Sequence, residues 1–205
     1  MSGLLTKTQL AAIADQITEI EKATDAEIVT VLAKHADDYY YIPTLWAAMA
    51  GVIAPSALLL LPHWLVLSEI LLIQVSLFGV LALLLRSPFL LRRLIPKQVR
   101  HWRASNLARR QFLENNLHHT EGGLGVLIFV SELERYVEIL ADRGVAEQIP
   151  NETWALIVQS FTQRVGQGEV YEGFDQCLQA VGVELAAKFP ITQDKNELPN
   201  HLVLI

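Results

Sequence analysis

The chain has 205 residues, of which 52% are hydrophobic, and a formal net charge of −6. Its one cysteine, Cys177, excludes an internal disulfide framework and fits a reducing compartment. Charge is unevenly distributed: eight of the 16 Lys and Arg residues lie between Arg86 and Arg110 with no acidic residue among them, and the other eight are spread among 22 Asp and Glu residues.

The amino-terminal segment predicts a helix followed by a strand. Apolar residues recur at helical spacing from Leu10 to Ile20, after potential caps at Thr6 and Thr8. In Glu27 to Lys34, apolar side chains point to both sides of an extended chain. This pattern indicates a central strand that is covered on both faces.

Residues 39–85 contain a single formal charge, Glu69. Within them, 43–61 and 64–85 each reach the roughly 20 apolar residues that a helix needs to cross a bilayer. Pro62 and His63 between them suit a tight turn. The segment therefore predicts a two-helix transmembrane hairpin, which returns the chain to the side from which it started.

The basic cluster that follows gives the predicted hairpin an orientation. Positive charge near the ends of membrane spans stays in the cytoplasm, so we expect a two-pass membrane protein with both flanks in the cytoplasm. Anionic lipid headgroups are the expected partners, at about 1 kcal/mol for each basic side chain near the surface. Nucleic acid is not expected, because Trp102 is the one aromatic residue interleaved in the C-terminal half of this cluster. The cluster consists of Arg86, Arg92, Arg93, Lys97, Arg100, Arg103, Arg109 and Arg110.

The carboxyl-terminal part predicts a helix, two strands and two further helices. A helix is expected from about Gln98 to Leu117, a fully covered strand over 126–130, and an edge strand over 136–142. Asn151 is the expected amino cap of the next helix, and the last helix ends before Pro190.

These elements predict an α/β fold, a small three-layer α/β/α sandwich with a mixed sheet, interrupted by the transmembrane hairpin. The first two strands are joined by a crossover and should pair in parallel. The amino-terminal segment is too short to bury a core alone, so it should dock with the carboxyl-terminal part. The expected divisions are 1–38 and 98–190 for the two parts of the α/β domain, 39–85 for the hairpin, 86–97 for a basic juxtamembrane segment and 191–205 for a loosely ordered tail.

Several stretches resemble the TPM domain family, named after a thylakoid lumen protein, a photosystem II associated protein and an acetylcholine-receptor modulator. They are residues 125–131, 134–139 and 141–144, together with 24–29 upstream and the helix that carries Trp154. The resemblance covers both predicted soluble parts but not the hairpin. It implies a three-layer α/β/α fold and the bacterial membrane-protein branch of the family, which together with the charge pattern predicts a place in the bacterial inner (cytoplasmic) membrane.

The family resemblance also implies chemistry. A plant member has acid phosphatase activity and a role in photosystem repair, and some bacterial members bind divalent cations. This chain departs from the family pattern in two places: the usual Gly-x-Gly-Leu stretch after the third strand is reduced to Gly144, and the Asp that commonly opens the next helix is Asn151. The loss of that carboxylate weakens the metal and phosphatase interpretations.

Asp142 is the first candidate for a site, because it ends the predicted third strand, where loops form pockets. Glu138 projects from the same side but lies about 13 Å away along the strand, too far to share an ion. A calcium or magnesium site would therefore use Asp142 with loop groups such as Glu27 or Asn151. A structural role for Glu138 and for Arg135, in ion pairs that cover a sheet edge, is the simpler interpretation.

Two other features carry weaker alternatives. His118, His119 and Glu121 have metal-ligand chemistry, but histidines at a helix carboxyl end are explained by the helix dipole. Glu69 within the second span could serve an ion or lipid pathway, although two helices are too few for a transport route without oligomerisation.

The sequence shows no catalytic constellation, so the first functional hypothesis is a membrane-anchored interaction, assembly or quality-control factor for membrane proteins. The alternative is a divalent-cation-dependent phosphatase that uses Asp142 near Arg135. An ion or lipid pathway around Glu69 is the third.

Overall fold

The computed structural model describes residues 5–58, 65–192, 198 and 202–205. The chain divides into two compact units: an α/β unit made of residues 1–36 and 101–205, and a helical unit made of residues 37–100. The turn expected at Pro62 and His63 lies outside the described residues.

The α/β unit is built on a mixed sheet in which the described strands have the order β3-β2-β1-β4. β1 (Glu27–Ala33) pairs in parallel with β2 (Gly125–Ser131) and with β4 (Leu202–Leu204). β3 (Tyr136–Ala141) pairs antiparallel with β2 and forms one edge. The parallel pairing of the first two strands and the edge position of the third are confirmed.

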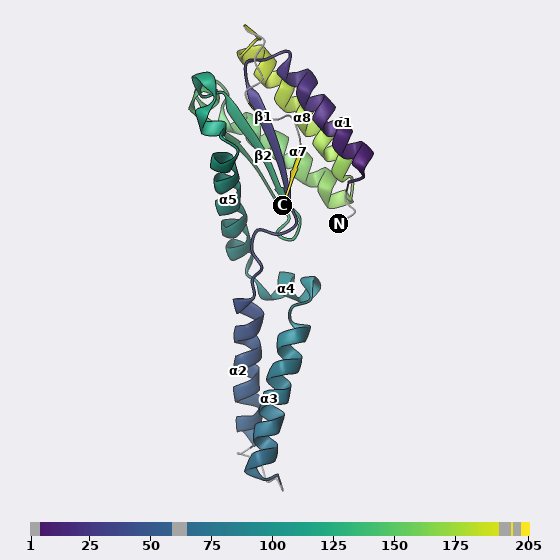
Figure 1. The fold of residues 1–205 in the computed structure, drawn as a ribbon, viewed down its shortest axis with the longest axis vertical. Helices are drawn as coiled ribbons and strands as arrows, with labels where there is room; N and C mark the ends of the chain where they lie inside the picture. The colour runs from purple at the N-terminus through teal and green to yellow at the C-terminus, as the bar shows by residue number, and fades with distance from the viewer. Residues whose placement is uncertain (1–4, 59–64, 193–197, 199–201) are drawn as a thin grey trace. The chain divides into compact units, whose positions relative to one another are not determined.

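Helices cover both faces of this sheet (Figure 1). α1 (Lys7–Glu21), α7 (Asn151–Gln167) and α8 (Val170–Lys188) pack on one face. α5 (Lys97–Glu114), from His101 onward a part of the α/β unit, packs on the other. The predicted three-layer α/β/α sandwich is therefore confirmed.

The side chains of β1 point alternately to the two faces of the sheet, and apolar residues on both faces explain why this strand is buried on both sides. Ile28 and Leu32 point into the core formed with α1, α7 and α8, whereas Val29 and Val31 point into the core formed with α5. Because successive side chains of a strand alternate in direction, an apolar residue at nearly every position requires a helix on each face.

The carboxyl-terminal tail differs from the prediction, because Leu202–Leu204 forms β4 rather than a loosely ordered segment. The N–H of Lys34 also donates to the carbonyl of Ile205 at 2.9 Å. A three-residue apolar run has no periodicity to read. It becomes a strand because the second edge of β1 offers unpaired backbone groups.

Two predicted helix boundaries also need correction. Pro150, not Asn151, is the amino cap of α7, and Asn151 is its first helical residue. α5 ends at Glu114 rather than near Leu117, and two short 3-10 turns follow, η1 (Leu117–His119) and η2 (Glu121–Gly123). Asn116 adopts a left-handed backbone conformation before η1, which ends the α-helical path.

The helical unit contains α2 (Tyr41–Leu58), α3 (Leu67–Leu84) and the short α4 (Pro88–Leu94). α2 and α3 pack along each other, and a Cβ placed on Gly51 would lie only 3.2 Å from Cβ of Phe78. By length and composition, α3 could cross a membrane, whereas the apolar part of α2 is shorter. A two-pass topology remains a prediction.

Candidate functional site

α5 and β3 present polar side chains to each other along one side of the sheet. His101, Ser105 and Arg109 recur every four residues on α5, and Tyr136 and Glu138 alternate toward α5 on β3. The rings of His101 and Tyr136 lie edge to face at 5.1 Å between centroids. The hydroxyl of Ser105 donates to Oε1 of Glu138 at 3.4 Å. This helix and this strand therefore form a polar strip within the α/β unit.

Tyr136 remains a neutral hydrogen-bond donor in this strip. Burial raises the pKa of its phenol above the ordinary value; a hydrogen bond with Ser105 opposes that shift, and the nearby Glu138 carboxylate adds to it. The phenol therefore keeps its proton at neutral pH.

The strip ends in an open hollow of about 290 Å³ at the last residues of β3. Most of its wall is apolar, with one guanidinium and one carboxylate among its lining groups. Leu113 in this wall is 55% exposed. Such a surface can hold an apolar group beside a charged one. The lining residues are Arg109, Phe112, Leu113, Leu140, Ala141 and Asp142.

Backbone contacts fix Asp142 at the edge of this hollow. Its N–H donates to the carbonyl of Gly125 at 2.8 Å, which continues the β2–β3 register by one residue. Its carboxylate accepts from the N–H of Arg143 at 2.7 Å and caps the short helix α6 (Arg143–Ala146). Its first role is therefore to begin a helix.

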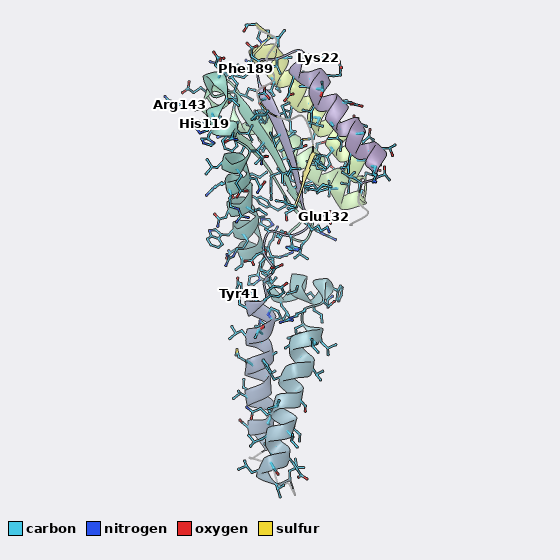
Figure 2. All side chains as sticks on the ribbon, in the orientation of Figure 1. Lys22, Tyr41, His119, Glu132, Arg143 and Phe189 are labelled. Carbon is cyan, nitrogen blue, oxygen red and sulfur yellow. The ribbon has the colours of Figure 1, made fainter. Side chains whose placement is uncertain are left out.

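Gly144 has a steric reason to be glycine. A Cβ at this position would lie 2.2 Å from the carbonyl oxygen of Gly122 and 2.9 Å from that of Gly123. The η2 turn consequently packs directly on the backbone of α6. Figure 2 labels His119, the last residue of η1, and Arg143, the first residue of α6, at the same end of the α/β unit.

The structure separates Arg135 from Asp142. They flank β3 at opposite ends, roughly 20 Å apart for an extended strand of this length. Arg135 is exposed in the turn before the strand, with a backbone φ of 51°. The basic residue that shares a hollow with Asp142 is Arg109, which sequence reasoning missed because the contact between α5 and β3 joins distant parts of the chain.

The other predicted ligands do not converge on Asp142. Glu27 is 4% exposed and is in register with Gly125, so its backbone lies two strands from that of Asp142, roughly 10 Å away. Asn151 is exposed at the start of α7. Among the described residues, no three His, Cys, Asp or Glu side chains are grouped closely enough to hold an ion. Calcium or magnesium at Asp142 would need backbone carbonyl groups and water as further ligands.

The weaker candidates have local roles. His118 and His119 are exposed, with ring centroids 3.9 Å apart. Glu69 accepts a hydrogen bond from the N–H of Val66 at 3.0 Å and thereby satisfies the amino end of α3. Cys177 is buried, and burial raises the pKa of its thiol to about 12, which leaves it unreactive at neutral pH.

Comparison with known proteins supports the family resemblance. Residues 96–184 match the sequence model of the TPM domain. This segment of the chain is similar to the TPM domain. A search of curated proteins finds no significant match. The match includes α5, β2, β3 and most of α8, so the hollow and the polar strip lie within the matched segment.

A solved structure has the same fold. The BA42 protein from the psychrophilic bacterium Bizionia argentinensis, determined by NMR, is similar with a TM-score of 0.62 and 19% sequence identity. The alignment covers 100% of this chain and 98% of that one. At this identity the similarity supports the α/β fold alone.

Proposed function

We propose that this protein is a TPM domain tethered to the bacterial inner membrane, facing the cytoplasm, that binds membrane proteins during their assembly or quality control. The observation that carries the tether is the apolar surface of α3. Ile70 is the one residue of this helix that is buried, whereas Val75 is 69% exposed and Leu83 is 71% exposed. In water, each such side chain would forgo about 1.5–3 kcal/mol of burial free energy, and a hydrocarbon environment removes that cost.

The packing of α2 on α3 suits a hairpin within lipid. Pro43, Ala47, Gly51 and Pro55 are buried at four-residue intervals along α2. Small residues let two helices approach closely where van der Waals contact, rather than the hydrophobic effect, drives their association. This stripe supports a second membrane-crossing helix although α2 is the shorter one.

Aromatic and basic side chains gather where the hairpin begins and ends. The guanidinium of Arg86 lies 5.4 Å from the ring centroid of Tyr40, and that of Arg93 lies 5.0 Å from the ring centroid of Phe89. Tyrosine at the headgroup level and arginine on the cytoplasmic side are typical of membrane proteins. These pairs support cytoplasmic orientation and contact between Arg86 to Arg110 and anionic headgroups.

A binding role suits the TPM domain better than catalysis. The polar strip holds Ser105 against the carboxylate of Glu138 at 3.4 Å, a distance at the long end of the hydrogen-bond range, so this contact does not make the hydroxyl a strong nucleophile. The hollow instead combines apolar walls with a guanidinium, a surface that suits recognition.

Thiol labelling in intact cells tests the topology. Val66→Cys places a thiol just before α3, at the turn end of the hairpin, and Val183→Cys places one on the exposed surface of α8. An impermeant reagent should label Val66→Cys in intact spheroplasts and Val183→Cys only after lysis. The buried Cys177 provides a silent background. The reverse pattern would contradict the orientation.

Affinity capture in mild detergent tests the partner. The full-length protein should recover the same membrane protein complex from independent preparations, and Val75→Arg, which weakens insertion, should lose it. Repeated recovery of the protein alone would count against the assembly role.

A metal-dependent phosphatase is the second candidate, because Arg109 and Asp142 line one hollow and the matching family model carries phosphatase in its name. Asp142→Asn is the informative variant, because asparagine caps a helix as well as aspartate does but cannot bind a cation as a carboxylate does. The purified protein with magnesium or calcium should hydrolyse p-nitrophenyl phosphate, and the variant should lose at least 100-fold in kcat/KM. An equal rate in both proteins would eliminate this mechanism.

A further inference from the structure

β3 forms one edge of the sheet, so its outward backbone groups pair with no other strand among the described residues. Because the N–H of Asp142 donates to Gly125 within the β2–β3 register, the residues of β3 alternate between facing β2 and facing outward. This parity directs the backbone N–H and C=O groups of Val137, Ile139 and Ala141 away from the sheet. Three donors and three acceptors are thereby placed in a row along the edge.

This edge lacks the features by which proteins usually protect an edge strand. β3 pairs with β2 over six consecutive residues without a bulge, and it contains neither proline nor lysine. Its one charged side chain, Glu138, is directed toward Ser105 on α5 rather than outward. A straight, unprotected edge is a template for another strand.

The hollow beside Leu140 lies next to this edge, so an added strand would meet side-chain contacts as well as backbone groups. Alternate side chains of that strand would point to the α5 side of the sheet. One of them would reach the apolar walls formed by Phe112, Leu113 and Leu140. We call the outward edge of β3 and this hollow together the edge groove.

The arginine side chains beside the edge groove favour an acidic occupant. Arg110 is paired with Glu114, and Arg143 is paired with Glu147. By contrast, Arg109 and Arg135 form no ion pair with any described residue, and both are exposed. One lines the hollow and the other precedes the first residue of β3. These two exposed guanidinium groups, one beside the hollow and one before β3, favour carboxylates in a bound segment.

We propose that the edge groove binds an extended acidic peptide segment of a partner protein by strand addition, with an apolar side chain in the hollow and carboxylates on Arg109 and Arg135. About six or seven residues span the edge. Main-chain hydrogen bonds supply affinity, and the hollow and the two arginines supply specificity. This inference deepens the proposed binding role by naming the class of partner, and it rests on that role.

A synthetic peptide provides a direct test with the full-length protein in lipid nanodiscs. The probe is the acetylated and amidated peptide Glu-Thr-Val-Thr-Leu-Thr-Glu, whose acidic and apolar side chains share one face of a strand. Fluorescence anisotropy should detect its binding, and replacement of both Glu by Lys should weaken it at least tenfold. Absence of binding at millimolar peptide would overturn the proposal.

N-methylation tests strand addition without any change in the protein. One probe carries methyl groups on its three Thr amides, and the other carries them on its Val and Leu amides. Since alternate N–H groups of an added strand face β3, one of these probes should lose binding at least tenfold and the other should keep it. Equal behaviour of the two probes would rule out strand addition.

Protein variants locate the site. Arg109→Glu should weaken binding of the acidic probe at least tenfold, whereas Arg110→Glu, one residue away and already paired with Glu114, should change it less than threefold. Ile139→Pro removes an outward N–H but spares the ladder to β2, and it should abolish binding; Ile139→Val is its control. If Ile139→Pro instead converts a dimer into a monomer, the edge belongs to a second copy of the chain and the proposal fails.

The outcome is separable from that of the proposed function. Recovery of a membrane complex whose composition is unchanged by Arg109→Glu would place the partner elsewhere on the protein and would leave the tethered binding role intact. Peptide binding by a protein that does not fractionate with membranes would support the edge groove and remove the tether.

Discussion

The two units of this molecule place the same kinds of residue in opposite positions. In the α/β unit, Leu127 and Phe129 of β2 are completely buried between helices. In the helical unit, Val75 and Leu83 of α3 point outward. Charged residues have the opposite distribution. The α/β unit carries exposed acidic side chains such as Glu147 and Glu152, whereas α3 carries Glu69 at its first turn and no other charge.

This contrast shows that burial is decided by the surroundings for which each unit is built. A sheet with helices on both faces removes its apolar side chains from water. Two helices packed on each other cannot do so, because each keeps most of its circumference exposed. The helical unit therefore leaves an apolar surface uncovered by the described residues, which a bilayer would cover under the proposed tether.

The largest expected effect comes from one substitution made in each unit. Leu127→Ala removes a completely buried side chain and should lower the unfolding free energy of the α/β unit by about 2–5 kcal/mol. Leu83→Ala, on the outward surface of α3, should change it by less than about 0.5 kcal/mol. Denaturant unfolding in detergent, followed by near-ultraviolet circular dichroism, measures both. Similar losses would mean that α3 belongs to a buried core.

An arginine introduced on α3 or on α8 tests whether that helix surface faces lipid or water. Val75 and Val183 are both 69% exposed, the first in the middle of α3 and the second on α8. Val75→Arg should oppose membrane insertion by about 2.5–3.5 kcal/mol, the cost of arginine at the centre of a span, whereas Val183→Arg should have no effect. Carbonate extraction of membranes gives the retained fraction. Equal retention of the two variants would contradict the assignment of α3 to lipid.

Acid–base behaviour sharpens the contrast, because the α/β unit buries a carboxyl group. Burial raises the pKa of Glu21 from an ordinary 4.5 to about 8, although its carboxylate accepts from the N–H of Ile28 at 2.9 Å, and the nearby Glu27 adds to the shift. The folded state binds this proton more tightly than the unfolded state. Its contribution to stability is therefore complete below about pH 4.5 and is lost as the pH rises to about 8.

Glu21→Gln measures that contribution. Glutamine keeps an acceptor for Ile28 but has no charge. The difference in unfolding free energy between wild type and variant should change by up to about 1.4 kcal/mol per pH unit between pH 4.5 and 8, in the direction that destabilises wild type as the pH rises. A constant difference across this range would show that Glu21 is ionised without cost.

The smallest effect concerns how helices begin in the two units. α1 begins with a capping box, in which the hydroxyl of Thr6 accepts from the N–H of Gln9 at 3.2 Å. Thr6→Ala should cost about 1 kcal/mol of unfolding free energy, and Thr6→Ser should restore it. α3 is capped by Glu69 alone, so Glu69→Ala should leave the α/β unit unchanged. Thermal unfolding of both variants provides the comparison.

Local patterns were sufficient to predict most of the fold. The apolar alternation of residues 27–33 and 125–131 identified two central strands, and the crossover between them predicted their parallel pairing. β4 was not predicted, because a run of three apolar residues is too short to show a strand periodicity. The cap of α7 was placed one residue late because Asn151 has the chemistry of a cap, whereas the actual cap, Pro150, contributes only its extended backbone.

The candidate site was harder to predict, because its parts meet only through the tertiary fold. Asp142 could be chosen as the residue that ends a strand, and strand geometry alone places Arg135 too far from it. No sequence pattern distinguishes Arg109, because it is one of eight basic residues in a segment that contains no acidic residue. Its position in the hollow follows from the packing of α5 across the sheet.

The insertion of residues 37–100 between β1 and β2 dictates an order of events during biosynthesis. Adjacent strands of one sheet are separated by residues 34–124, which take a ribosome roughly 5–18 s to translate at 5–20 residues per second. During that interval β1 has no β2 with which to pair, while the apolar residues 39–85 leave the ribosome. Under the proposed membrane tether, the nascent chain would be anchored before β1 and β2 can pair.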